Sequence, residues 1–202
     1  MKNLICLFGV FISLFTYGKD QYKINLVSKS SNSVIIDFDL DNYKLISLHK
    51  SNNESFQKLV VQGGVPTLTK GEPELLKFTS NIQLPSKGVS NFSIISADFV
   101  ELENVNIAPS KGNLYRNIDP NMVQFQKGAV YSVDSDFPSE VFNLGQPYIH
   151  RDIRGQTINF IPFGFNPVRK TIKIYNKIRV KITFLTKELG INELSILPRK
   201  AI

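Results

Sequence analysis

The sequence predicts an all-β protein, an antiparallel β-sandwich or half-barrel with long Pro/Gly-rich loops. Residues 22–26, 34–40 and 172–184 alternate apolar and polar side chains with the period of two that strands have. Segments rich in glycine and proline separate such runs, and no convincing amphipathic helix occurs. The composition, with 42% hydrophobic and 20% charged residues, is typical of a chain that folds.

The first two alternating runs predict a hairpin. The polar segment 30–33, Ser-Ser-Asn-Ser, lies between them and is typical of a turn. A third short run, 43–48, and a longer one, 92–100, are rich in branched and aromatic residues, which favour strands.

The clearest strand lies near the end of the chain. Its apolar residues share one parity over 172–184, and only Asn176 interrupts them. Thirteen residues exceed the usual strand length, so we expect either two strands that meet at 175–177 or one bent strand with a bulge there. The opposite parity carries a basic stripe, which we interpret as a solvated strand face and not as a nucleic-acid site: Lys173, Lys177, Arg179 and Lys181.

Proline and glycine mark the loops, at 63–73 and 108–120 above all. Because proline has no amide hydrogen for a ladder, we expect edges, bends or loops at Pro138, Pro147, Pro162 and Pro167. A short helix over 187–197 is an option that Gly190 and Pro198 limit. No composition break indicates a linker, so residues 19–202 are expected to form a single domain.

The N-terminus has the pattern of a secretory signal peptide. Lys2 is followed by the apolar run 4–17, and Thr16 and Gly18 are small residues at the −3 and −1 positions of a cleavage site. We therefore expect a signal peptide at 1–18 and an exported chain, periplasmic or secreted to the cell surface, with no membrane contact after cleavage. The alternative is an uncleaved anchor. Cleavage would also remove Cys6, the one cysteine of the sequence, and with it any thiol chemistry.

The residues needed for catalysis are sparse. His49 and His150 are far apart and belong to no metal-ligand spacing, and no nucleotide-binding or hydrolase motif occurs. Asp134 and Asp136 are better interpreted as solvated turn residues than as an acid–base pair. The sequence thus predicts a protein that is not an enzyme and uses no cofactor or metal. Its formal net charge of +7 suits an anionic partner without requiring one.

Three segments carry a more specific pattern. Residues 64–68 read GVPTL, and 108–112 read APSKG, followed by RNIDP at 116–120. The third, 149–156, reads IHRDIRGQ and continues through FIPF, NPV and KTIKIY to residue 175. These segments resemble the N-terminal propeptide of the gingipain family of cysteine endopeptidases, although Thr69 replaces a proline of the family pattern.

The resemblance implies a β-rich prodomain that assists folding of a gingipain-like cysteine peptidase catalytic domain and keeps it latent during export. In the family, a basic residue of a prodomain loop enters the primary specificity pocket of the peptidase. By position after the APSKG segment, that residue would be Arg116, with Lys111 as the alternative if the pocket prefers lysine. An arginine fork suits a pocket carboxylate because it makes paired, charge-assisted hydrogen bonds. We expect the loop to be supported by Pro109, Gly112, Asp119 and Pro120.

The sequence departs from the family in one large respect, because no catalytic domain follows before Ile202. The chain could act on a separate peptidase, be one part of a peptidase split over two genes, or be a truncated fragment of a precursor. A different class also remains, a non-enzymatic β-sandwich that binds surface glycan or protein through Tyr131, Phe137 and Tyr148.

Overall fold

The computed structural model describes residues 21–48 and 54–194. The predicted signal peptide and His49 lie outside these ranges. Within these ranges, eleven strands and two short 3₁₀ turns account for the regular structure: β1 (Tyr22–Lys29), β2 (Ser33–Leu40), β3 (Lys44–Ser47), β4 (Gln57–Val60), β5 (Val65–Pro66), β6 (Leu76–Gln83), β7 (Val89–Leu102), η1 (Pro120–Met122), η2 (Ala129–Ser132), β8 (Phe142–His150), β9 (Ile153–Phe160), β10 (Phe163–Asn166) and β11 (Thr171–Leu185). No helix in the described ranges is long and apolar enough to cross a membrane.

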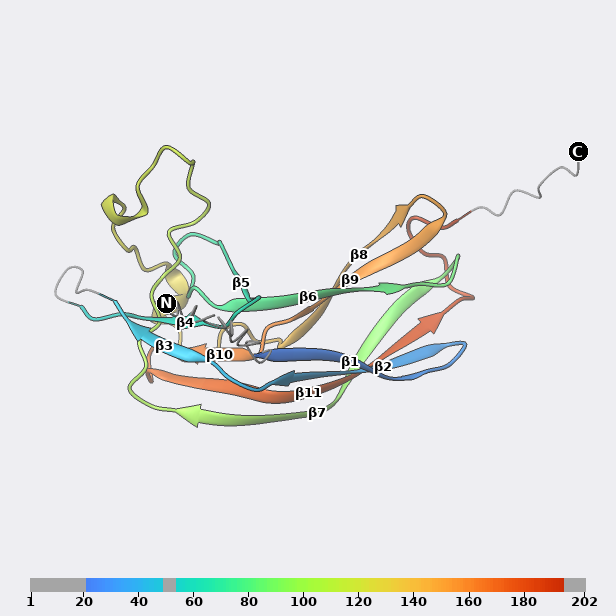
Figure 1. Ribbon diagram of the computed structural model, residues 1–202, viewed down its shortest axis with the longest axis horizontal. Helices are drawn as coiled ribbons and strands as arrows, with labels where there is room; N and C mark the ends of the chain where they lie inside the picture. The colour runs from blue at the N-terminus through green and yellow to red at the C-terminus, as the bar shows by residue number, and fades with distance from the viewer. Residues whose placement is uncertain (1–20, 49–53, 195–202) are drawn as a thin grey trace, which may run out of the picture.

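The strands form two main antiparallel layers, as Figure 1 shows. In one layer β1, β2, β11 and β10 follow one another, and β7 pairs with the other side of β11. The other layer has the order β5-β6-β9-β8, and β3 and β4 form a separate hairpin. The prediction of an all-β antiparallel fold is therefore confirmed.

Aromatic side chains fill the space between the layers. Phe38 of β2 lies 5.2 Å from the ring of Phe78 on β6 and 5.1 Å from that of Phe160 on β9, measured between ring centroids. All three are fully buried. Burying each ring contributes about 2–3 kcal/mol, so the strand alternation seen in the sequence translates directly into one continuous core.

The long C-terminal strand forms as one element. The register of β11 against β7 shifts between Tyr175 and Lys177, so Asn176 is the extra residue of a bulge. The single bent strand is thus the correct one of the two alternatives. Its six apolar residues of one parity point into the core: Ile172, Ile174, Ile178, Val180, Ile182 and Phe184.

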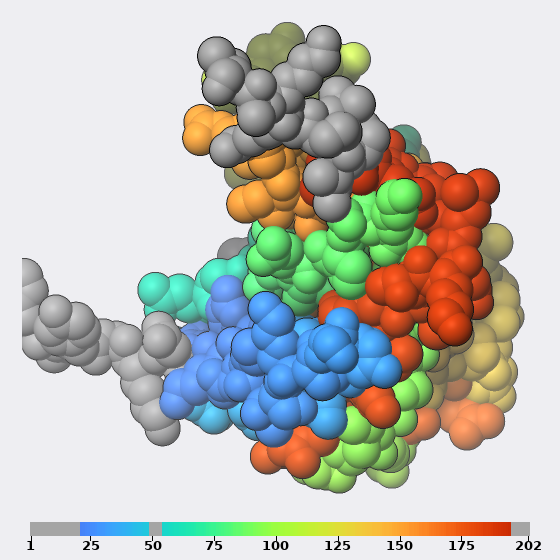
Figure 2. All heavy atoms as spheres, turned by 90° about the vertical axis from the view of Figure 1, so that its right-hand side faces the viewer, coloured from blue at the N-terminus to red at the C-terminus, as the bar shows by residue number. Residues whose placement is uncertain are grey.

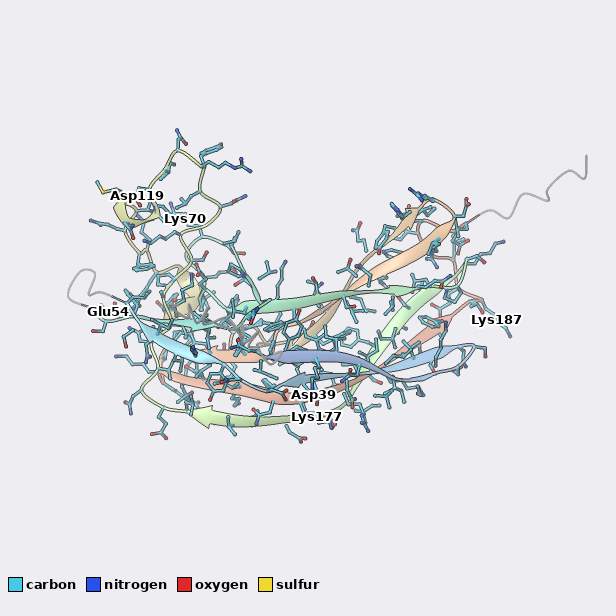
Figure 3. The ribbon with its side chains drawn as sticks, viewed as in Figure 1. Asp39, Glu54, Lys70, Asp119, Lys177 and Lys187 are labelled. Atoms are coloured by element: carbon cyan, nitrogen blue, oxygen red, sulfur yellow. The ribbon has the colours of Figure 1, made fainter. Side chains whose placement is uncertain are left out.

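The basic stripe of β11 lies on the outer face and is largely paired with carboxylates. Arg179 donates from Nε and Nη2 to the two oxygens of Asp37, each at 2.6 Å. Lys177 lies 3.9 Å from Asp39, and Figure 3 shows these two side chains next to each other. The hydrogen bonds from Arg179 hold the pKa of Asp37 below its ordinary value. The stripe therefore ties β11 to β2 and is not a row of free cations.

The structure also shows the effect of proline and glycine at two of the predicted positions. Pro147 lies in β8, which is an edge strand, and the register is irregular there, as expected of a proline in a sheet. The optional helix over 187–197 does not form over 187–194, and the remainder lies outside the described residues. Gly190 explains this, because its backbone packs tightly against the carbonyl of Gly88, a contact that a side chain at 190 would block.

Candidate functional site

The segment 111–127, which we call the Arg116 loop, projects from one end of the sandwich (Figure 1, upper left). Its two ends meet at a single residue. Gly71 donates its amide to the carbonyl of Ser110 at 2.9 Å, and its own carbonyl accepts from the amide of Gly128 at 2.8 Å. Both limbs of the loop are therefore tied to the same residue, which fixes the width of the loop base.

This closure requires glycine on both sides. Gly71 has φ of +84°, which disfavours other residues. A Cβ on Gly128 would lie 2.9 Å from the carbonyl oxygen of Gly71, closer than side-chain carbons approach. The backbones can meet only because neither residue has a side chain.

The entry limb is held by the sheet before it turns outward. Pro109 forms an isolated bridge with Pro73, and the amide of Ser110 donates to the carbonyl of Glu72 at 2.7 Å. Pro109 and Ser110 are both buried. Gly112 has φ of +79° and its amide donates to the Ser110 hydroxyl, which turns the chain away from the core.

Lys111 connects the two limbs inside the loop. Its Nζ donates to the carbonyl of Pro120 at 2.7 Å and lies 4.3 Å from the ring centroid of Phe125. Phe125 in turn packs on Phe56, 5.3 Å between ring centroids. The half-buried Lys111 is therefore engaged within the loop.

Asp119 and Pro120 start the short turn η1. The Asp119 carboxylate accepts from the amide of Asn121 at 2.9 Å, which caps the turn, and Pro120 occupies its first position. Figure 3 labels Asp119 on the projecting part and Lys70 toward the foot of the loop. All four predicted support residues thus lie at the limbs of the loop.

Arg116 lies at the tip. The amide of Ile118 donates to the carbonyl of Tyr115 at 3.0 Å, which closes a tight turn with Arg116 and Asn117 at its centre. Arg116 is exposed, and its guanidinium makes no hydrogen bond or ion pair with any residue in the described ranges. Tyr115 and Met122 of the same loop are 80% and 81% exposed. The loop therefore presents a free cation to solvent.

A cavity of about 640 Å³ lies beneath the loop, between it and the hairpin β3–β4. Its lining is mostly apolar and includes Leu68, Leu114 and Phe125. Lys58 and Glu74 also line it and form an ion pair at 2.8 Å. The loop is thus supported by its base and by Lys111, and it is not packed flat on the sandwich.

Charged contacts also secure the chain beyond the loop. Lys127 pairs with Glu54 at 2.5 Å, and this hydrogen bond is the main cause of the lowered pKa of Glu54. The Tyr131 hydroxyl donates to the carbonyl of Ile107 at 2.8 Å, and burial raises its pKa. These contacts hold the chain after the loop against the residues before β4, through Glu54, and against the segment that leads into the loop, through Ile107.

The other candidate groups have structural surroundings. Asp134 pairs with Arg169 at 2.8 Å and Asp136 with Lys173 at 2.7 Å, so neither carboxylate faces the other as an acid–base pair would. His150 is exposed at the end of β8. Within residues 21–48 and 54–194, no three potential metal ligands lie together.

The aromatic residues considered for a glycan-binding module are mostly occupied. Tyr131 and Phe137 pack against the core, and the ring of Tyr148 lies so close over Gly155 that a Cβ there would be 2.8 Å from it. They do not form a shared exposed platform.

Comparison with known proteins decides the family. The family model Propeptide_C25 matches residues 16–195. The chain belongs to this propeptide family. It is 35% identical to gingipain R1 of Porphyromonas gingivalis over 173 residues, which is 85% of this chain and 17% of that protein. It is 32% identical to gingipain R2 of the same organism over 174 residues, 86% of this chain and 23% of that protein. The chain therefore spans less than a quarter of these relatives.

Solved structures agree with the family. The structure described as a complex of Porphyromonas gingivalis RgpB pro- and mature domains matches with a TM-score of 0.81 and 31% identity, covering 86% of this chain and 90% of that one. A structure on the zymogenic latency of gingipain K from the same organism shares the fold, with a TM-score of 0.68, 16% identity and coverage of 84% and 95%. The resemblance found in the three sequence segments is thus confirmed, and the propeptide domain to which the chain corresponds is not itself catalytic.

Proposed function

We propose that the chain is an exported prodomain that keeps a gingipain-like cysteine peptidase latent and assists its folding, by inserting Arg116 into the specificity pocket of the peptidase. The observation that carries the proposal is the free guanidinium of Arg116 at the tip of a loop whose base is closed by Gly71. The related RgpB structure, described as a complex of pro- and mature domains, supports a peptidase catalytic domain as the partner.

The surroundings favour Arg116 over Lys111 as the inserted group. Lys111 would have to leave the carbonyl of Pro120 and the ring of Phe125 to reach a partner. Arg116 breaks no such contact when it binds. Its guanidinium can donate two parallel hydrogen bonds to a carboxylate, and these bonds are stronger when the pocket excludes water.

The loop is ordered before it binds, and this favours tight binding. Ordering a flexible loop during association consumes part of the interaction free energy, about 0.5–1.5 kcal/mol for each immobilised long side chain. The Arg116 loop already has its base closed, its limbs joined by Lys111 and its last turn capped by Asp119. Less ordering is therefore needed when the pocket closes around the tip.

The test is inhibition of the mature domain of RgpB, measured with arginyl and lysyl peptide substrates, by the chain purified after export. We expect inhibition by the unaltered chain, and at least a tenfold weaker inhibition by Arg116→Ala, because a lost buried charged hydrogen bond costs about 1.5–3 kcal/mol. Arg151→Ala is the matched control, because Arg151 is also exposed at the tip of a turn but lies in the β8–β9 hairpin. Equal inhibition by the two variants would refute the role of Arg116.

A further inference from the structure

Strand β7 has an open edge that lacks the protection seen on β1, β8 and β5. It pairs with β11 along 172–185, and no strand in the described parts of the chain pairs with its other side. Elsewhere, β1 carries Lys23 and Lys29, β8 contains Pro147, and β5 is only two residues long. Charges, prolines and short length are the usual means of preventing a sheet edge from pairing with another chain.

The strand is long, apolar and without basic residues. Its fourteen residues include no lysine, arginine or proline. Figure 1 shows β7 along the lower border of the molecule, and in Figure 2 its light-green side chains lie at the lower surface. Five of its large apolar side chains are between 37% and 52% exposed: Phe92, Ile94, Ile95, Phe99 and Val100. Such an edge is suited to β-strand addition.

The apolar side chains of β7 on the core side of the sheet are spaced symmetrically in sequence. Residues directly opposite each other in a ladder point to the same face, and the buried residues of β11 therefore place Ser90 and five apolar residues in this row. The apolar residues are Phe92, Ile94, Ala97, Val100 and Leu102, and the intervals between them are two, three, three and two residues. This apolar part of the row therefore has the same spacing in both directions from Ala97.

We infer that β7 pairs with β7 of a second copy of this chain, antiparallel, about a twofold axis at Ala97. In that register Phe92 lies opposite Leu102 of the second copy, and Ile94 opposite Val100. Each contact joins two apolar side chains on the same face, so the core surface continues from one copy into the next.

The charged residues agree with the same register. Asp98 lies opposite Ser96 of the second copy, and Glu101 opposite Ser93, so each carboxylate faces a hydroxyl donor. No two like charges are opposed. Ile95, the extra residue of a bulge between Ile94 and Ser96, lies opposite Phe99, so the pairing covers two more of the exposed side chains. The apolar residues and the charged residues therefore each favour the same register about Ala97.

The size of the contact sets its strength. In this register the eleven residues from Phe92 to Leu102 pair and extend about 36 Å, and such a contact buries less than about 1,000 Å² in total, below the usual size of specific interfaces. The dimer is therefore reversible and depends on concentration.

Sedimentation velocity of the chain purified after export, between about 1 and 100 µM, tests the dimer. We expect the dimer fraction to rise with concentration and to be lost in Ile95→Lys. Ile153→Lys is the matched control, because Ile153 of β9 is also 52% exposed. A monomer at every concentration overturns the inference, as does equal dimerisation of the two variants. Loss of peptidase inhibition in Ile95→Lys with a monomeric unaltered chain assigns the edge to the peptidase instead.

A disulfide tests the register. Ala97→Cys places two thiols opposite each other at the twofold axis, within the Cα separation that a disulfide spans. Ser93→Cys is the control, because it places its two thiols many residues apart, and removal of the signal peptide would take Cys6 from both variants alike. Oxidation should link Ala97→Cys into a covalent dimer and leave Ser93→Cys unlinked. Equal linking, or linking of Ser93→Cys alone, contradicts the proposed register.

Discussion

Replacing Lys111 with methionine tests how far the loop is ordered before it meets a partner. The substitution keeps an unbranched side chain of similar length but removes the 2.7 Å hydrogen bond to the Pro120 carbonyl and the cation above Phe125. A charged hydrogen bond contributes about 1.5–3 kcal/mol and an exposed cation–π contact about 0.5–1 kcal/mol. Because Lys111 is only half-buried, we expect the two together to contribute about 1–2 kcal/mol to ordering of the loop.

The expected result is inhibition of the RgpB mature domain that is about 5–30 times weaker in Lys111→Met. The reason is that only the ordered fraction of the loop is competent to bind. The assay is the inhibition constant, with the thermal unfolding temperature measured in parallel to show that the sandwich is intact. Lys70→Met is the control, since Lys70 is an exposed lysine at the foot of the loop.

Two outcomes would refute this reasoning. An unchanged inhibition constant would show that Lys111 does not order the loop. A loss larger than that of Arg116→Ala would instead identify Lys111 as the group that enters the pocket.

Three further predictions concern the sandwich and the loop base. Phe38→Ala should lower the free energy of unfolding by about 3–5 kcal/mol in urea titrations, because it opens a cavity between the layers. Asp37 has a lowered pKa in the folded protein, so its pairing with Arg179 adds stability above the ordinary carboxyl pKa of 3.8, and that stability is lost as the pH falls through the lowered folded value. Asp37→Asn should therefore unfold at lower denaturant at pH 7 and show a flatter pH dependence below pH 4. Gly128→Ala should weaken inhibition of the peptidase, because the added Cβ would force the loop base open. Gly164→Ala is the control and should not weaken inhibition, because its Cβ would lie 3.7 Å from the nearest atom, Asp136 Cβ. Equal effects of the two substitutions would contradict the proposed closure of the loop base.

The alternation of β11 allowed its prediction from the sequence, whereas β9, which buries two long polar side chains, could not be predicted in this way. β11 was evident because its inward residues are all aliphatic or aromatic. β9 was missed because two of its buried residues are Arg154 and Gln156. The Nη1 and Nη2 groups of Arg154 donate to the carbonyls of Pro85, Gly88 and Ile191, which come from distant segments. The local sequence around Arg154 contains no pattern that would identify these distant partners.

The candidate loop was located from a family resemblance, and its physical support was not visible in the sequence. The residues Pro109, Gly112, Asp119 and Pro120 were expected because they flank Arg116. The closure by Gly71 depends on a contact across more than fifty residues, and the hydrogen bond from Lys111 depends on the path of the folded loop. Both are tertiary features, for which a single sequence carries no periodic signal.

Binding to a peptidase whose specificity pocket is already filled tests the central claim most directly. The RgpB mature domain would be treated with a covalent inhibitor that carries arginine in the pocket, and the affinity of the chain for treated and untreated peptidase would be compared by calorimetry. If Arg116 enters the pocket, the treated peptidase should bind at least tenfold more weakly. Equal affinities for the two forms would contradict the account.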